Sequence, residues 1–280
     1  MYLVTGATGN VGSELVDQLL ASGEKVRVLT RDAAKAARWD DRVQVATGDF
    51  ADVEAFAKAA AGVKAVFLMN GATDGEVFHK VVAAVKAMGV PRIVFMSSSL
   101  ASAPEYTLGR LHKEKEDSIR ESGVPYSVVR PGGFMSNAYQ WIGTIKSQGV
   151  VYNALGEVKF PPIAPEDIAA VSAKMLTAPN GSGEVLELTG GELTNTPEQV
   201  RTLAQVLGRE VHCVDVPVEA AVEGMIRSGL PPQVAKAVGE SIDAVRKGRA
   251  INKTDTVERV LGRPPMTFAA WAQMHAARFS

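Results

Sequence analysis

The sequence has a single cysteine among 280 residues, which excludes an internal disulfide. That residue, Cys213, lies in an alternating segment, and we interpret it as a buried structural thiol in a reducing, cytoplasmic setting. Long apolar runs are also missing, and only three residues precede Val4. We therefore expect neither a membrane-spanning helix nor a signal peptide.

An excess of charge of one sign is the next absence. The chain has 30 Lys and Arg against 31 Asp and Glu, so it has no long-range field to gather a polyanion, and we expect no nucleic-acid partner. Low hydropathy is absent too, because 46% of the residues are apolar, which excludes wholesale disorder. A chain of this length forms either one large α/β domain or a domain with a smaller appended lobe, and we favour the second.

Short apolar runs alternate with amphipathic stretches through the first half of the sequence. This alternation is typical of parallel strands joined by crossover helices, so we expect a Rossmann-type α/β fold with a doubly wound parallel sheet. Strands are predicted at residues 1–5, 25–30, 43–47, 65–69, 92–97 and 126–130. Helices are predicted at residues 11–22, 53–61, 76–88 and 108–122, with stop signals at Gly23, Gly62, Gly89 and Gly123.

Three glycines, Gly6, Gly9 and Gly12, punctuate the turn between the first predicted strand and the first predicted helix. Glycines at this spacing give a tight turn, let the backbone approach a pyrophosphate and allow close helix packing, while the helix N-terminus adds free amides. The alternative is a structural turn without a ligand. The strand before and the helix after favour a dinucleotide site, to which we assign Gly6, Thr8, Gly9, Asn10, Val11 and Gly12.

The end of the second predicted strand selects the form of the dinucleotide. An acidic residue there accepts from the ribose hydroxyls of NAD, whereas an arginine pairs with the 2′-phosphate of NADP. Arg31 occupies this position and its donors match a phosphate, so NADP(H) is the preferred cofactor. Asp32 keeps NAD(H) open, because it either neutralises Arg31 or accepts from the ribose itself.

Ligands of open α/β sheets bind at the carboxyl ends of the strands. Asp49 and Phe50 follow the third predicted strand, where the carboxylate is placed to accept from the adenine amino group and the ring to flank the base. The alternative is that they only form a turn. By position we add to the site the residues that follow the fourth and fifth strands, Asn70, Gly71, Ser97 and Ser98.

The sequence changes character after residue 133, where the loops lengthen and a short strand is predicted at residues 184–189. We interpret residues 1–131 as the NAD(P)-binding Rossmann domain. Residues 132–280 are interpreted mainly as a smaller α+β substrate lobe, with some segments returning to the Rossmann core. Within the lobe, Thr196 and Thr267 are predicted to cap helices.

Several motifs together support a family resemblance. They are residues 4–12, Arg31, residues 48–50, the serine run at 97–99, and residues 130–137, 165–169 and 254–265. In these motifs the chain resembles the NmrA-like branch of the atypical short-chain dehydrogenases/reductases, which includes NAD(P)H:quinone reductases and nucleotide-sensing regulators. The resemblance covers nearly the whole chain and implies that Pro131 and Gly132 contact the cofactor.

Carbonyl-reducing members of that superfamily use a Tyr-x-x-x-Lys helix, which this sequence lacks. His112 and Glu116 stand one turn apart in its place, as in the NmrA-like branch. A histidine held by a carboxylate titrates near neutral pH, so His112 either protonates a reduced substrate or binds the nicotinamide ribose. The alternative is a solvated helix face, because six successive residues from His112 are titratable. Tyr106 ranks second as a catalytic candidate, beside Ser98.

Apolar and aromatic residues follow the sixth predicted strand. Phe134, Met135, Tyr139 and Trp141 form either the wall of a pocket for a flat ligand, with Asn137 as a polar point, or the core of the lobe. We expect an apolar, flat small-molecule substrate, no metal, and a monomer or homodimer.

Two functions from different classes remain open. One is an NADPH-dependent oxidoreductase that transfers hydride to a quinone-like or conjugated carbonyl or imine compound, whose reduced form takes protons from solvent. The other is a non-catalytic NADP(H)-binding redox sensor of the NmrA type. We favour the enzyme.

Overall fold

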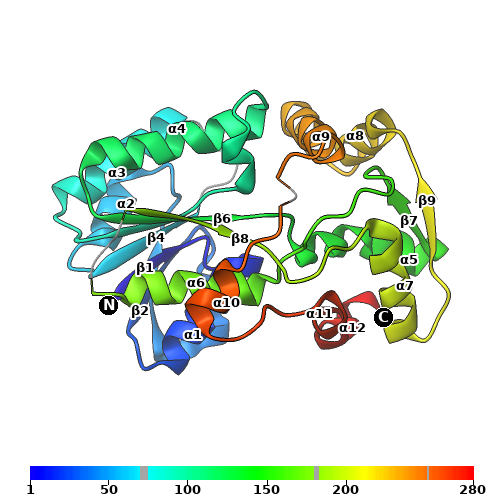
Figure 1. Cartoon of the computed structure of the whole chain (residues 1–280). Coiled ribbons are helices and arrows are strands. Elements are labelled where there is room, and N and C mark those ends of the chain that lie inside the picture. Colours follow the sequence, from blue (N-terminus) through cyan, green and yellow to red (C-terminus); the bar gives the residue numbers. More distant parts are fainter. Residues whose placement is uncertain (70–74, 180–182, 251) are drawn as a thin grey trace. The chain divides into compact units, whose positions relative to one another are not determined.

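A computed structural model describes residues 1–69, 75–179, 183–250 and 252–280 (Figure 1). The chain divides into two compact units, each with most of its residue contacts inside itself. The first comprises residues 1–98, 111–130 and 165–187, and the second comprises residues 99–110, 131–164 and 188–280.

The first unit is built on a seven-stranded sheet in the order β3-β2-β1-β4-β5-β6-β8. Neighbouring strands from β3 to β6 run parallel, which confirms the predicted Rossmann-type fold. The strands are β1 (Tyr2–Thr5), β2 (Val26–Thr30), β3 (Val43–Thr47), β4 (Ala65–Met69), β5 (Ile93–Met96), β6 (Tyr126–Pro131) and β8 (Glu184–Leu188). Strand β8, predicted within the lobe, instead lies beside β6 in this sheet.

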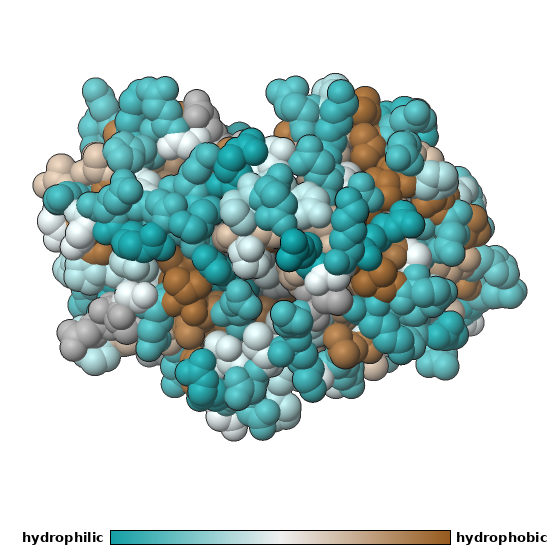
Figure 2. Space-filling model, turned by 45° about the horizontal axis from the view of Figure 1, so that its top comes forward, coloured by the Kyte–Doolittle hydropathy of each residue, from teal (hydrophilic) through white to brown (hydrophobic). Residues whose placement is uncertain are grey.

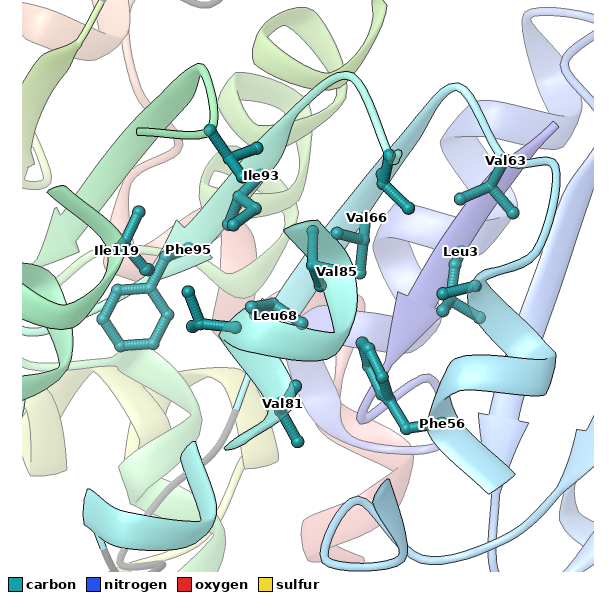
Figure 3. Close-up of a cluster of buried hydrophobic side chains, with 14 of the residues drawn as sticks. Leu3, Phe56, Val63, Val66, Leu68, Val81, Val85, Ile93, Phe95 and Ile119 are labelled. Atoms are coloured by element: carbon teal, nitrogen blue, oxygen red, sulfur yellow. The ribbon is translucent and has the colours of Figure 1, made fainter. Parts of the chain in front are cut away.

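Helices cover both faces of the sheet (Figure 1). On one face α1 (Asn10–Ala21) packs against α6 (Pro165–Thr177), and on the other lie α2 (Val53–Ala60), α3 (Gly75–Ala87) and α4 (Thr107–Ser122). Figure 3 shows the core between the sheet and the second set of helices, where aliphatic and phenylalanine side chains of β1, β4 and β5 meet those of α2, α3 and α4. Burial of this apolar surface stabilises the layer that presents the carboxyl ends of the strands.

The second unit contains a small parallel sheet of β7 (Val150–Asn153) and β9 (His212–Asp215), which the sequence did not predict. Cys213 lies on β9 and is half-buried. The unit's helices are η2 (Ser99–Ser102, 3₁₀), η3 (Met135–Trp141, 3₁₀), α5 (Ile142–Gln148), α7 (Thr196–Leu207), α8 (Val218–Arg227), α9 (Pro232–Arg246), α10 (Thr256–Leu261), α11 (Phe268–Met274) and α12 (Ala276–Phe279), together with the first turn of α4. Thr267 caps α11 as predicted, whereas Asn195, not Thr196, caps α7.

The first turn of α4 belongs to the second unit and is capped by a distant side chain. A carboxylate oxygen of Glu240, on α9, accepts a hydrogen bond from the Thr107 amide at 3.0 Å. Gly109 allows the turn to pack closely, because a Cβ atom there would lie 2.2 Å from the Ala103 carbonyl oxygen. The start of this helix therefore depends on a residue far along the chain.

The face in Figure 2 is mostly covered by hydrophilic side chains, with hydrophobic ones in separate groups. Among the described residues, no helix is both long and apolar enough to cross a bilayer. The same residues contain no cluster of three or more His, Cys, Asp or Glu side chains suited to a metal ion.

Candidate functional site

The glycine-rich turn between β1 and α1 has the geometry of a phosphate cradle. Gly6 has a φ of 62°, which favours glycine, and its carbonyl accepts from the Gly9 amide at 3.0 Å. A Cβ atom at Gly12 would lie 2.1 Å from the Gly6 carbonyl oxygen. Two of the three glycines are thus required, Gly6 by its positive φ and Gly12 because a Cβ atom there would meet backbone atoms.

The N-terminus of α1 has no side-chain cap. Gly9 is the N-cap residue, the first turn contains no acidic residue, and the first helical bond joins the Ser13 amide to the Gly9 carbonyl. The preceding amides at Asn10, Val11 and Gly12 therefore lie outside the helical ladder and are suited to an anion. Thr8 and Asn10 are exposed, whereas the Val11 side chain is buried, so Val11 can offer only its amide.

At the end of β2, Arg31 pairs with an aspartate other than the predicted one. Its Nη1 lies 3.6 Å from Oδ2 of Asp49, and the Arg31 side chain is 81% exposed. Asp32 instead accepts from the Ala34 amide at 3.0 Å and caps the following 3₁₀ helix η1 (Ala33–Arg42). Of the two roles left open for Asp32, neutralisation of Arg31 is therefore wrong, because the backbone of η1 competes for that carboxylate.

The two candidate residues after β3, Asp49 and Phe50, both make contacts within the first unit. Asp49 accepts from the Ala51 amide at 2.8 Å through its other oxygen. The Phe50 ring is half-buried and packs against Phe56 and Phe78, with ring centroids 5.8 and 6.0 Å apart. Asn70 and Gly71 lie outside the described residues.

Ser97, at the end of β5, is buried and donates to a carboxylate oxygen of Glu116 at 2.5 Å. Arg130, which lies on β6, also donates to the two carboxylate oxygens of Glu116, at 2.8 and 2.6 Å. The Glu116 side chain has no exposed surface, and its hydrogen bonds raise the pKa of Arg130. This two-pronged buried pair joins α4 to β6.

His112 therefore lacks the carboxylate partner predicted for it. Its ring is half-buried, with its centroid 6.3 Å from that of Phe95, and its Nδ1 is buried without a hydrogen-bond partner among the described residues. Burial lowers the pKa of His112 to about 4, an effect that the Lys115 charge reinforces and the Glu116 charge opposes. The prediction that Glu116 holds the pKa of His112 near neutral is wrong, because burial outweighs the Glu116 charge and that carboxylate binds Arg130.

The alternative of a solvated helix face from His112 does not hold for the whole run, because Lys115 and Glu116 are both buried. Lys115 lies 5.8 Å above the Phe78 ring, and burial lowers its pKa to about 8, against the opposing Glu114 charge. Sequence reasoning gave no role to Lys115 or Arg130. A signal for Lys115 was present, since it falls on the helical stripe that also contains Leu111 and Ile119.

The remaining candidate residues lie near the ends of β5, α4 and β6. Ser98 is half-buried after β5 in the first unit. In the second unit, Tyr106 is half-buried just before α4, and its amide donates to the Ala103 carbonyl. Pro131 is buried, and the Gly132 amide donates to the Leu188 carbonyl at 2.9 Å.

The predicted substrate wall is divided between surface and core of the second unit. Met135 is buried in the hydrophobic cluster around Trp271, and the Tyr139 ring is tilted by 42° against that indole with centroids 5.2 Å apart. Phe134 and Trp141 are half-buried, while Asn137 is exposed. Met135 is therefore part of the core of this unit, and a substrate role for the other four residues stays a prediction.

Comparisons with known proteins agree with this geometry. The model of an NAD(P)H-binding family matches residues 6–179. The chain is 35% identical over 282 residues to (4-alkanoyl-5-oxo-2,5-dihydrofuran-3-yl)methyl phosphate reductase of Streptomyces griseus, covering 100% of this chain and 99% of that protein. It is 34% identical over 284 residues to the NAD(P)H azoreductase of Xenophilus azovorans, with the same coverage of 100% and 99%.

Among solved structures, an NADPH-dependent quinone oxidoreductase of Escherichia coli complexed with NADPH superimposes with a TM-score of 0.85 and 25% identity. The superposition covers 98% of this chain and 99% of that structure. The expected resemblance to reductases of the atypical short-chain group is thereby confirmed.

Proposed function

The chain belongs to the NAD(P)H-binding family, and we propose that it transfers hydride from NADPH to flat, conjugated small molecules such as quinones, enones or azo compounds. That it is an NAD(P)H-dependent oxidoreductase follows from its family and from relatives that are reductases over their whole length. The class of acceptor is the part that we propose.

The residues present fit the cofactor. The uncapped amides of α1 and the turn from Gly6 to Gly12 would hold the pyrophosphate, and Arg31 would meet the 2′-phosphate. The cofactor, when bound, supplies the hydride. The protein's contribution is to bind and orient it at the carboxyl ends of the strands.

One observation carries the choice of acceptor, namely that the Nδ1 atom of His112 is buried without a hydrogen-bond partner among the described residues. This burial lowers the pKa of His112 to about 4, so near pH 7 the ring is not an imidazolium that could act as a general acid. Reduction of an isolated ketone needs an acid beside the developing alkoxide. Hydride addition to a conjugated acceptor instead gives a delocalised anion, which takes its proton from water.

The names of the relatives support this class of acceptor. An acyl-dihydrofuranone, an azo compound and a quinone share a conjugated electrophile, although their functional groups differ. The chemistry common to them requires hydride delivery and no strong protein acid.

The test is NADPH oxidation at pH 7 with matched pairs of acceptors. We expect turnover of a benzoquinone, an azo dye and cyclohexenone, and none of cyclohexanone, which has the same size without conjugation. The variant His112→Gln should keep most of the kcat for the quinone, whereas loss of a true general acid lowers kcat by about 100-fold or more. Equal reduction of cyclohexanone would contradict the proposal.

The regulator alternative predicts tight NADP(H) binding without turnover of any acceptor. It is the weaker candidate, because the relatives at 34% and 35% identity are reductases along their full length. Cofactor binding measured beside turnover separates the two functions.

A further inference from the structure

An arginine and an aspartate meet at the carboxyl ends of β2 and β3, where the adenosine ribose of the dinucleotide is expected. We propose that Asp49 sets the balance between NADPH and NADH. It holds Arg31 when the 2′ position carries a hydroxyl, and it competes with a 2′-phosphate for the same guanidinium. This inference rests on the cofactor site of the proposed function and assigns to Asp49 a role different from contact with adenine.

The sheet brings the two residues together. Strands β2 and β3 are paired in parallel up to Thr30 and Thr47, and the Gly48 amide extends the pairing by donating to the Thr30 carbonyl at 3.0 Å. A Cβ atom at Gly48 would lie 2.7 Å from Cβ of Ala55, so glycine permits this close path. The next residue on each strand extension, Arg31 and Asp49, is thus held at the same edge.

The Asp49 carboxylate is oriented by its own backbone. One oxygen accepts from the Ala51 amide at 2.8 Å, and the other lies 3.6 Å from Nη1 of Arg31. The aspartate is about half exposed, and the arginine is 81% exposed. The carboxylate is therefore the fixed member of the pair, and the guanidinium is free to turn toward a phosphate.

Asp32 does not share this role, although it is adjacent to Arg31 in the sequence. Its carboxylate accepts from the Ala34 amide and caps η1. Of the two aspartates that flank this edge, only Asp49 lies within ion-pair distance of Arg31 among the described residues.

The consequences for the two cofactors are opposite. An exposed ion pair changes an equilibrium by about 1.5- to 5-fold, so breaking the Arg31 to Asp49 contact weakens NADPH binding by that order. The carboxylate also repels the phosphate dianion directly. With NADH no pair need break, and Asp49 remains available to accept from a ribose hydroxyl. We therefore expect the protein to bind both dinucleotides, and we expect its preference for NADPH over NADH to be smaller than it would be if Arg31 had no ion-pair partner.

The experiment isolates the 2′ position by titrating calorimetrically with 2′,5′-ADP and with 5′-AMP, which lack the nicotinamide. Asp49→Asn keeps an acceptor for the Ala51 amide and removes the charge. We expect it to bind 2′,5′-ADP about 3- to 5-fold more tightly, with 5′-AMP unchanged or weaker. Asp49→Ser, which also keeps a short acceptor, is the second variant should the first be unstable.

Arg31→Ala should lower the affinity for 2′,5′-ADP by about 10-fold or more. In that background Asp49→Asn should give a smaller gain, because only the direct repulsion remains to be relieved. The matched control is Asp52→Asn on the same loop, where the carboxylate caps α2 by accepting from the Ala55 amide at 3.0 Å. This control should leave the ratio of the two affinities unchanged.

An unchanged ratio in Asp49→Asn would overturn the inference, and so would an equal shift in Asp52→Asn, which would indicate a general loss of negative charge. A shift in Asp32→Asn in place of Asp49→Asn would overturn it as well. These outcomes leave the reductase function intact. If neither nucleotide binds the unaltered protein, the cofactor site and the proposed function fail together with this inference.

Discussion

Acidification from pH 7 to pH 5 is expected to destabilise the folded chain through His112. The folded pKa of about 4 lies below the usual histidine value of 6.5, so between these values the unfolded chain binds a proton that the folded chain does not. The His112 contribution to the free energy of unfolding is therefore fully present above pH 6.5 and falls as the pH drops toward 4. The cause is burial beside Phe95 with Lys115 nearby, which penalises the imidazolium.

The size of the effect follows from the pH interval. Between the unfolded pKa of 6.5 and pH 5, the free energy of unfolding falls by about 2 kcal/mol, at 1.36 kcal/mol per pH unit. We expect a loss of about 1–2 kcal/mol, because part of the ring is accessible to solvent. Urea unfolding at pH 7 and pH 5 measures it. The variant His112→Gln removes the titration, and His79→Gln is the matched control because His79 is exposed and bonded to Ser118.

The quantity to compare is the loss of stability between pH 7 and pH 5, because contributions of the other titratable groups cancel between variants. The unaltered chain and His79→Gln should lose about 1–2 kcal/mol more than His112→Gln. Parallel losses in all three would show that His112 titrates alike in the folded and unfolded chains, which would refute the reasoning about its burial.

Three further predictions concern other parts of the first unit and the start of α4. Gly12→Ala should abolish tight NADPH binding, because the methyl group would lie 2.1 Å from a carbonyl oxygen of the phosphate turn; an unchanged Kd by fluorescence titration would contradict the cradle. Glu116→Gln should lower the free energy of unfolding by about 3 kcal/mol, because Arg130 loses its buried counter-charge, and thermal unfolding would show a lower Tm. Glu240→Ala should cost about 1 kcal/mol and speed hydrogen exchange at the Thr107 end of α4, whereas Glu240→Gln still accepts from that amide and should preserve most of the protection.

The fold was predictable where local signals agree with the global pattern. The strands of the first unit's sheet lie within one residue of the predicted bounds, because each is an apolar run closed by a turn signal. The four predicted stop glycines, Gly23, Gly62, Gly89 and Gly123, all adopt positive φ. The path of the turn between β1 and α1 was predictable for the same reason, since backbone geometry requires glycine at Gly6 and Gly12.

The side-chain partners were not predictable from spacing. Glu116 lies one helical turn from His112, yet its oxygens bind Arg130 and Ser97, which approach only after β5 and β6 pair. The Asp32 and Asp49 assignments differ for the same reason, because register between β2 and β3 selects the partner of Arg31.

Competition between neighbouring residues limits local prediction too. Asn195 and Thr196 are both good caps, and the reciprocal bonds between Asn195 and Glu198 select the earlier one. Strands β7 and β9 escaped prediction because each is short and finds its partner about 60 residues away.

The described chain changes unit five times, at residues 98/99, 110/111, 130/131, 164/165 and 187/188. A proteolytic fragment ending near residue 131 would therefore lack α6, which packs on α1, and β8, which closes the edge beyond β6. Its exposed apolar helix face and unpaired strand would invite aggregation. No single cut yields a complete nucleotide-binding half, so gene fusion or domain exchange cannot transplant that half as one contiguous piece.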